Sequence, residues 1–278
     1  MNLPSSDDQF EQICGYQIRF KTVIPNRAKA HIVFVHGLGE HGNRYDSIAR
    51  QFNAEGFATT QFDLPGHGQS SGVRGDITRY YQFYTIINHF KNKLEHLPNI
   101  LFAHSMGGNI AFNYLLQKST NPTICASIGS PWLQLAFKPS NIKIVLARVA
   151  MKFAPKMIQN TGLETSGISR TTEEVRRYSQ DRLIHSFISP RLFTLIQTKG
   201  LRLKKRIQEL TTPVFLYHGE KDVITSFKAS KELSSLSNKI EFTSYKEAYH
   251  EVHNEPEKDI LFASILNFYN QQLIKNET

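Results

Sequence analysis

Asn99-Ile-Leu-Phe-Ala-His-Ser-Met-Gly-Gly108 is the stretch on which the predicted fold of this chain depends. It begins as a short apolar strand, and after Gly108 the apolar residues return at helical spacing. A strand that turns sharply into a helix around a serine is typical of a nucleophile elbow, because the turn exposes the hydroxyl at the carboxyl end of the sheet. Ser105 is therefore a candidate nucleophile. The usual pattern has glycine two positions earlier, where this chain has Ala103, larger by one methyl group.

The composition is that of a globular protein with a large buried core. Of the 278 residues, 40% are hydrophobic and 21% are charged, which suits one large α/β domain with an insertion. No apolar run reaches about 18 residues, and the polar residues 1–11 lack the pattern of a secretory signal. Two cysteines, Cys14 and Cys125, predict neither a disulfide framework nor a metal site, and the expected location is the cytoplasm.

The chain is basic, with a formal net charge of +9 and a pI near 9.4. Such a charge attracts nucleic acid or anionic lipid. No zinc-finger spacing or nucleic-acid motif accompanies it, so no nucleic-acid partner is expected. The basic residues gather partly between positions 138 and 206, where a lipid-binding surface and a solvated basic face are the alternatives. The oligomeric state is left open by the sequence.

Apolar runs bounded by turn residues predict a series of strands. They are Tyr16–Ile24, His31–Val35, Phe57–Asp63, Asn99–Ala103, Ile124–Ile128, Pro213–Tyr217 and Ile240–Tyr245. Helical patterns lie between most of them, and this alternation predicts a mostly parallel sheet with helices on both faces. Ligands of such sheets bind at the carboxyl ends of the strands, where His36, Asp63 and Ser105 are expected.

Residues 132–210 interrupt this alternation, because they have helical patterns without a convincing strand. We expect them to form a helical cap between a first part of the core, residues 1–131, and a second part, residues 211–278. Within the cap, residues 142–157 are predicted to form an amphipathic helix with a basic flank. Such a helix would either lie on an anionic membrane or pack on the sheet with its lysines in solvent.

A serine nucleophile needs a base, and the base needs an acid that orients it. In sheets of this kind the acid and then the histidine follow the serine along the chain. Asp222 follows a clean strand and is the predicted acid, with Glu220 as the alternative; His218 is interpreted as a strand-end residue. His250 follows the last strand and is preferred as the base over His253, because it lies nearer the strand end.

Two backbone N–H groups are expected to form an oxyanion hole near the serine. One belongs to Met106, directly after Ser105 at the predicted helix N-terminus. The other is expected from the loop His36-Gly-Leu38, with the N–H of Leu38 as the candidate. The glycine of this loop lets the backbone approach a ligand closely. No metal or organic cofactor is expected.

Several motifs together carry a resemblance. They are His36-Gly-Leu-Gly-Glu-His41 with Arg44-Tyr45, Asp63-Leu-Pro-Gly-His-Gly-Gln-Ser70, His104-Ser-Met-Gly-Gly108 and Ala248-Tyr-His250, and in the middle block Ser169-Arg170 with Val175, Tyr178 and Asp181. The chain thereby resembles monoacylglycerol lipases and the lysophospholipase-like hydrolases grouped with them. The resemblance implies an α/β-hydrolase fold with a lipid-facing cap, and serine esterase activity on monoacylglycerols or lysophospholipids. It also implies the roles of nucleophile for Ser105, acid for Asp222, base for His250, and oxyanion donors for Leu38 and Met106.

Three alternatives stand beside this interpretation. Gly37-Leu-Gly-Glu-His-Gly42 has the spacing of a dinucleotide-binding loop, but charged Glu40 and His41 occupy the turn that would receive a pyrophosphate. A non-catalytic ligand binder of the same fold is opposed by the complete set of nucleophile, base and acid. Acyl transfer or thioester cleavage by the same residues is not separable from ester hydrolysis by sequence.

Overall fold

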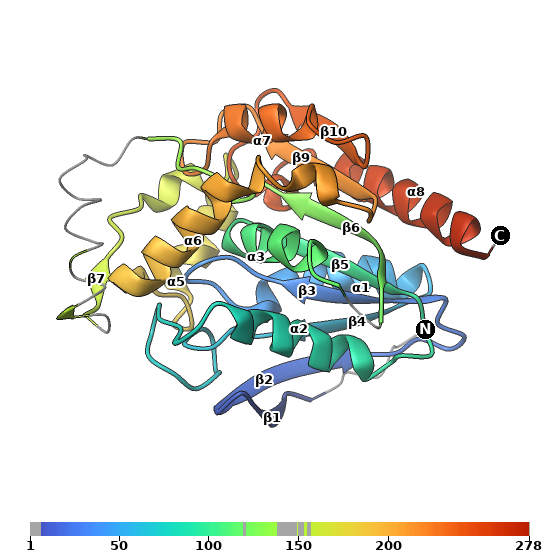
Figure 1. Cartoon of the computed structure of the whole chain (residues 1–278), viewed down its shortest axis with the longest axis horizontal. Helices are drawn as coiled ribbons and strands as arrows, with labels where there is room; N and C mark the ends of the chain where they lie inside the picture. Colours follow the sequence, from blue (N-terminus) through green and yellow to red (C-terminus); the bar gives the residue numbers. More distant parts are fainter. Residues whose placement is uncertain (1–6, 119–120, 138–148, 150–152, 155–156, 278) are drawn as a thin grey trace.

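An eight-stranded sheet in the order β1-β2-β4-β3-β5-β6-β9-β10 forms the centre of the molecule (Figure 1). The computed structural model describes residues 7–118, 121–137, 149, 153–154 and 157–277. The strands of this sheet are β1 (Gln9–Ile13), β2 (Tyr16–Val23), β3 (Ala30–Val35), β4 (Phe57–Phe62), β5 (Asn99–His104), β6 (Thr123–Gly129), β9 (Val214–Gly219) and β10 (Ile240–Tyr245). The pairs β1–β2 and β2–β4 are antiparallel, and from β4 to β10 all neighbours are parallel.

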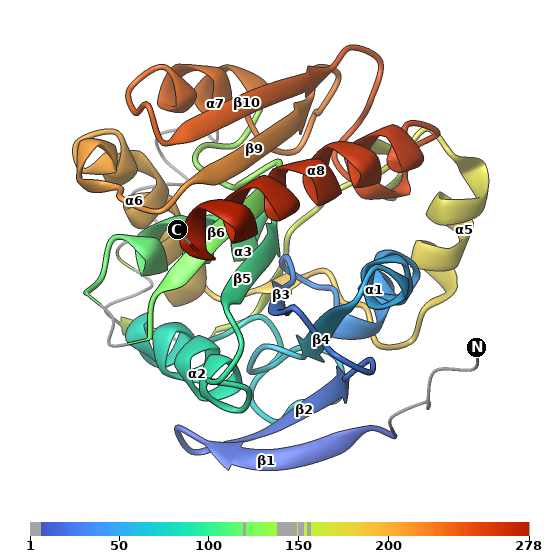
Figure 2. The same ribbon diagram turned by 90° about the vertical axis from the view of Figure 1, so that its right-hand side faces the viewer.

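Helices cover both faces of the sheet, as Figure 2 shows. One core cluster joins the sheet to α2, α3, α6 and α7, and the other joins it to α1 and α8. The helices are α1 (Asp46–Ala54), α2 (Tyr81–Asn92), α3 (Met106–Leu115), α5 (Thr172–Gln180), α6 (Pro190–Leu203), α7 (Phe227–Ser234) and α8 (Lys258–Glu277), with short 3-10 turns η1 (Gly42–Tyr45), η2 (Thr165–Gly167), η3 (Ile207–Glu209) and η4 (Val252–Asn254). No helix in the described ranges is both long and apolar enough to cross a membrane.

The central strands are continuous apolar runs because both of their faces are covered. Along β3, Val33 and Val35 point into the cluster on the α2–α3 side, whereas Ile32 and Phe34 point into the cluster on the α1–α8 side. This two-residue period follows from the pleat of a strand. The side chains of β5 alternate between the two clusters in the same way, up to the point where the chain leaves the sheet at Ser105.

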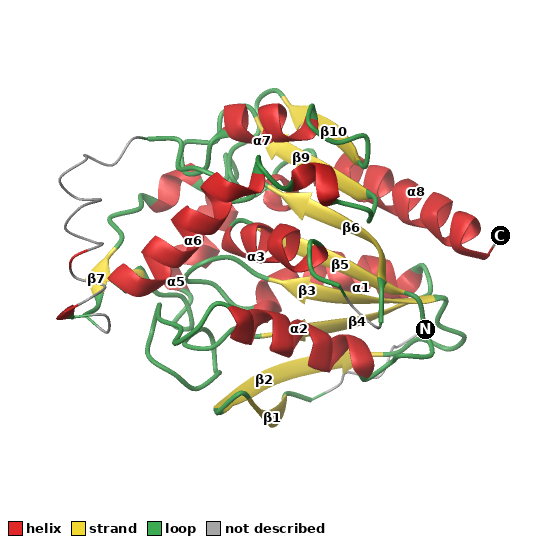
Figure 3. Ribbon diagram, viewed as in Figure 1, coloured by secondary structure: helices red, strands yellow, loops and turns green. Residues whose placement is uncertain are grey.

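The carboxyl ends of the parallel strands face α5 and the small antiparallel pair β7 (Gln159–Asn160) and β8 (Phe187–Ile188), as Figures 1 and 3 show. Helix α6, from the same block of sequence, packs against α3, where Asn109 Nδ2 donates to the carbonyl oxygen of Ile196 at 3.1 Å. The described part of residues 132–210 therefore contributes both to the layer over the strand ends and to the helical layer of the core.

The predicted α/β fold and its mostly parallel sheet are confirmed, and the predicted strands occur with slightly different ends. Strand β1 was not predicted, because it is an edge strand whose residues are mostly polar and exposed. The expectation that residues 132–210 contain no strand was wrong for β7 and β8, which are too short to produce an alternating pattern. Most of the helix predicted at 142–157 lies outside the described residues.

Candidate active site

Ser105 lies on a sharp turn between β5 and α3. Its backbone has φ 54° and ψ −117°, a region that costs a non-glycine residue on the order of 1–3 kcal/mol. The surrounding structure holds it there: Ser105 N donates to Gly129 O at 3.0 Å, and Ser105 O accepts from Trp132 N at 2.9 Å. A side chain at Gly107 would collide with the carbonyl oxygens that end β3, so the helix approaches the sheet this closely only without one. This is the predicted elbow, and Ala103 fits within it fully buried.

The structure brings Asp222 and His250 together from the loops after β9 and β10. His250 Nδ1 donates to Asp222 Oδ2 at 2.7 Å, and both side chains are buried. The alternatives do not take part in this contact. Glu220 is exposed and accepts from Ser244, and the ring nitrogens of buried His253 have no hydrogen-bond partner.

The electrostatics of this pair favour its charged form over its neutral one. Burial alone would lower the pKa of His250, but the charge and the hydrogen bond of Asp222 outweigh burial and raise it above the ordinary value. Burial would raise the pKa of Asp222, but His250 and His218 outweigh burial and hold it below the ordinary value. Asp222 is therefore an anion at neutral pH, and it keeps a hydrogen on Nδ1 of His250.

Two backbone segments approach Ser105 from different parts of the chain. Met106 is the first residue of α3, so its N–H has no partner within the helix. The loop after β3 approaches from the other side, where a Cβ built on Gly37 would be 3.5 Å from Ser105 Oγ. Leu38 follows Gly37 and lines the same cavity as Ser105. Glu40 Oε1 fixes this loop by accepting from Gly37 N at 2.6 Å.

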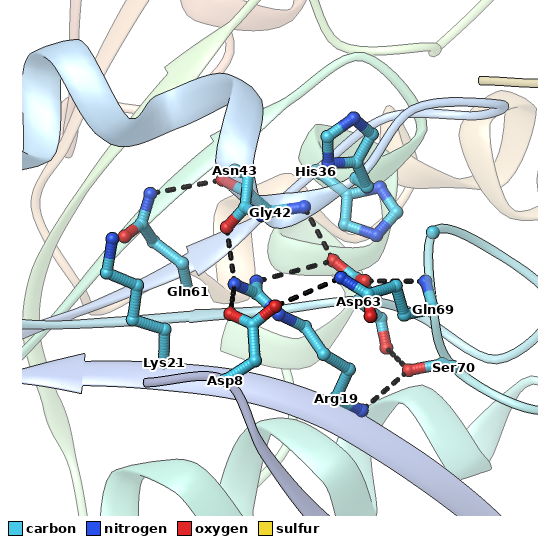
Figure 4. Close-up of polar contacts among 12 residues, drawn as sticks. Asp8, Arg19, Lys21, His36, Gly42, Asn43, Gln61, Asp63, Gln69 and Ser70 are labelled. Carbon is cyan, nitrogen blue, oxygen red and sulfur yellow. Dashed lines mark hydrogen bonds and ion pairs between the residues drawn. The ribbon is translucent and has the colours of Figure 1, made fainter. Parts of the chain in front are cut away.

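A buried polar network supports the far end of the same loop (Figure 4). Asp63, directly after β4, accepts from the backbone N–H of Gly42 at 2.8 Å and of Gln69 at 2.9 Å. Arg19 in β2 places its guanidinium 3.8 Å from Asp63 and also donates to Asn43. Burial outweighs these contacts and raises the pKa of Asp63. The sequence analysis did not single out Arg19, because an arginine in a predicted strand usually faces solvent.

A cavity of about 800 Å³ opens onto Ser105 and His250. Many of its apolar residues come from the 132–210 block, and we call five of them the apolar wall: Leu135, Leu163, Ile168, Ile188 and Phe193. Of the three glutamates in its lining, Glu40 and Glu251 come from the loops that also carry Leu38 and His250, and Glu164 comes from the 132–210 block. The volume and the dominance of apolar lining are typical of a site for a small organic molecule.

Arg44 joins the two glutamates of the cavity. Its Nη2 donates to Glu251 Oε2 at 2.5 Å, its Nε lies 3.5 Å from Glu40 Oε2, and its guanidinium lies 4.5 Å from the centre of the Tyr178 ring. One cation thus faces two buried carboxylates. Burial raises the pKa of Glu40, with Glu251 adding to the rise and Arg44 opposing it. The sequence interpretation had assigned no substrate-binding residue.

Among the described residues, no group of three or more His, Cys, Asp or Glu side chains is arranged to hold a metal ion.

The mostly parallel sheet, the sharp turn at Ser105 and the contact between Asp222 and His250 have the arrangement of an α/β-hydrolase. The sequence profile of the family described as serine aminopeptidase S33 (Hydrolase_4) matches residues 26–257, and the chain belongs to this family. The predicted likeness to monoacylglycerol lipases is confirmed by the relatives and the solved structure described next.

A Mycolicibacterium smegmatis monoacylglycerol lipase is 28% identical over 272 residues, which are 95% of this chain and 96% of that protein. An uncharacterized abhydrolase domain-containing protein of Dictyostelium discoideum is 30% identical over all of this chain, which spans 30% of that protein's length. The crystal structure of the Paleococcus ferrophilus monoacylglycerol lipase superimposes with a TM-score of 0.85 at 28% identity, covering 92% of this chain and 99% of that one. These similarities place the chain among carboxylic ester hydrolases.

Proposed function

We propose that this protein hydrolyses carboxylic esters of single-chain lipids, monoacylglycerols or lysophospholipids, through an acyl-Ser105 intermediate. The observation that carries the proposal is one cavity that joins Ser105 and His250 to an extended apolar wall. Burying an acyl chain against such a wall contributes about 0.8 kcal/mol per methylene group. The monoacylglycerol lipases to which the chain is similar support the same substrate class.

In the proposed reaction, His250 accepts the hydroxyl proton of Ser105 while the Oγ atom attacks the ester carbonyl. Nδ1 of His250 is engaged by Asp222, which leaves Nε2 for the serine. The N–H groups of Leu38 and Met106 stabilise the oxyanion. His250 then returns the proton to the leaving alcohol, and a water molecule, activated by His250, releases the fatty acid from Ser105.

In this proposal, different parts of the cavity contact the acyl chain and the alcohol part of the substrate. The acyl chain packs against the apolar wall, and the alcohol part lies near Glu40, whose buried Oε2 atom has no hydrogen-bond partner. Hydroxyl groups of a glycerol would satisfy such an acceptor. Val149, Phe153 and Met157 fall on the helix predicted at 142–157 and are exposed, and Val149 and Met157 also line the cavity. Apolar side chains at the mouth of the cavity support peripheral contact with a membrane as the route of the lipid.

Fatty-acid release from monoacylglycerols and lysophospholipids of graded acyl length tests this proposal. We expect the rate to rise with acyl length up to the capacity of the cavity, and to vanish in Ser105→Ala at unchanged thermal stability. Release that persists in folded Ser105→Ala, or a wild-type enzyme that acts equally on acetyl and long-chain esters, would contradict it. Adding alcohols as acceptors separates hydrolysis from acyl transfer.

A further inference from the structure

A second imidazole contacts the carboxylate of Asp222. His218 lies near the end of β9, is fully buried, and places Nε2 3.0 Å from Asp222 Oδ2. The same oxygen accepts the 2.7 Å hydrogen bond from His250 Nδ1. The sequence interpretation treated His218 as a strand-end residue. That position is correct, but the contact with Asp222 was not foreseen.

Asp222 fixes the tautomer of His218, and a second partner meets the other ring nitrogen. Nδ1 of His218 lies 2.9 Å from Oγ of Ser230, which is fully buried in α7. Because an ionised carboxylate only accepts, Nε2 of His218 must carry the hydrogen that faces Asp222. In the neutral ring Nδ1 is then an acceptor, and the Ser230 hydroxyl donates to it. A chain of two hydrogen bonds thus runs from α7 to Asp222.

Asp222 receives three more donors from its own loop. Oδ1 accepts from Ile224 N at 2.7 Å and from Thr225 N at 3.0 Å, and Oδ2 accepts from Thr225 Oγ1 at 2.8 Å. Every donor stabilises the carboxylate anion and takes up part of its charge. The backbone donors follow from the turn itself, whereas the imidazole of His218 depends on one side chain.

We propose that His218 is a positioning residue for the proposed reaction. By donating a hydrogen bond, His218 takes up part of the negative charge of Asp222 and thereby sets the pH at which His250 becomes a base. The inference rests on the proposed function. Without the N–H of His218, Asp222 attracts the proton on His250 more strongly. His250 then stays protonated, and unable to accept the proton of Ser105, up to a higher pH.

Other charged and titratable groups also face His250. They are the same in the wild type and in the His218 variants that test the proposal. The His104 ring lies 4.6 Å away, and His253 lies beyond it at 4.9 Å from His104. Burial lowers the pKa of His104 well below its usual range and that of His253 to about 4, so both are neutral where His250 titrates. The negative charges of Glu40 and Glu251 favour protonation of His250, and neither carboxylate forms a hydrogen bond with His218.

The test measures how fast a fluorophosphonate probe modifies Ser105 as a function of pH, because this rate requires unprotonated His250 but no knowledge of the substrate. In His218→Leu, which removes the donor, we expect the acidic midpoint of the rate to move up by about half a pH unit. In His218→Gln, whose amide nitrogen takes the place of Nε2, the midpoint should return to the wild-type value. His31→Leu is the matched control: His31 is a buried strand histidine bonded to Thr60, and its loss should not move the midpoint.

A midpoint that is equal in wild type, His218→Leu and His218→Gln overturns the proposal, even where all variants lose stability or rate. If His218→Leu does not fold, Ser230→Ala takes its place, with a smaller shift of the same sign expected and an unmoved midpoint contradicting the role. Folded wild type that does not react at all counts against the proposed nucleophile and not against His218.

Discussion

The pKa values of two buried carboxylates near His250 are shifted in opposite directions. The side chains of Asp222 and Glu40 are 0% and 4% exposed, so both lose the solvation of their charge. Asp222 accepts five hydrogen bonds and its pKa is lowered, whereas Oε2 of Glu40 has no hydrogen-bond partner and the pKa of Glu40 is raised. The number of donors, and not burial, therefore decides which carboxylate is a fixed anion and which has a raised pKa.

The largest effect is expected where the partner of Asp222 is removed. His250→Ala should lower kcat for ester hydrolysis by about 10⁵–10⁶-fold, because the nucleophile loses its base. His253→Ala should cost less than tenfold, since His253 stacks on Tyr45 at 5.2 Å and makes no contact with Asp222. Steady-state kinetics of the two variants decides between them, and the reverse order would make His253 the base.

A smaller but still large loss is expected when Asp222 is neutralised. Asp222→Asn keeps the size of the side chain but removes the charge that holds the hydrogen on Nδ1 of His250, so kcat should fall by about 10³–10⁴-fold. Glu220→Gln is the matched control and should stay within twofold of wild type, because Glu220 is exposed. Comparable losses in both variants would refute the assignment of the acid.

A modest effect is expected at the other carboxylate. Glu40→Gln keeps an acceptor for Gly37 N and Tyr45 Oη but removes the ionisable carboxyl group of a residue that lines the cavity. We expect kcat/KM to fall about three- to tenfold for monoacylglycerols, equivalent to the loss of one hydrogen bond of about 1 kcal/mol, and to change less than twofold for nitrophenyl esters. Equal losses for both esters would show that Glu40 acts on the loop and not on the alcohol part.

The smallest effect concerns stability and pH. Because folding raises the pKa of Glu40 above its unfolded value near 4.5, the native state binds the extra proton, and wild-type stability falls as pH rises above about 4.5. Glu40→Gln avoids this loss, so its Tm should exceed that of wild type by about 2–4 °C at pH 8 and by less at pH 4.5. A Tm gain that is larger at pH 4.5 would contradict the sign of the shift.

The sequence could predict the features of the fold and site that are encoded locally. Ser105, Asp222 and His250 each follow an apolar run that ends at the carboxyl edge of the sheet, so the rule for parallel sheets was enough to bring them to one edge. The glycines around Ser105 likewise indicate a tight turn on their own.

What the sequence could not predict depends on distant contacts. Arg44 and Glu251 are separated by 207 positions, and Arg19 reaches Asp63 from β2, 44 positions earlier in the chain. No local periodicity encodes such pairs. The contact of His218 with Asp222 spans only four residues, but its partner Ser230 lies in the next helix, and a histidine at a strand end has the same pattern with or without this bond.

Mass spectrometry of the peptide modified by a fluorophosphonate identifies the nucleophile, because only an activated serine reacts rapidly with this probe. We expect modification of Ser105 in the wild-type protein and none in Ser105→Ala of equal thermal stability. Modification of a different residue, labelling that persists in Ser105→Ala, or a folded wild-type protein that does not react would contradict this expectation.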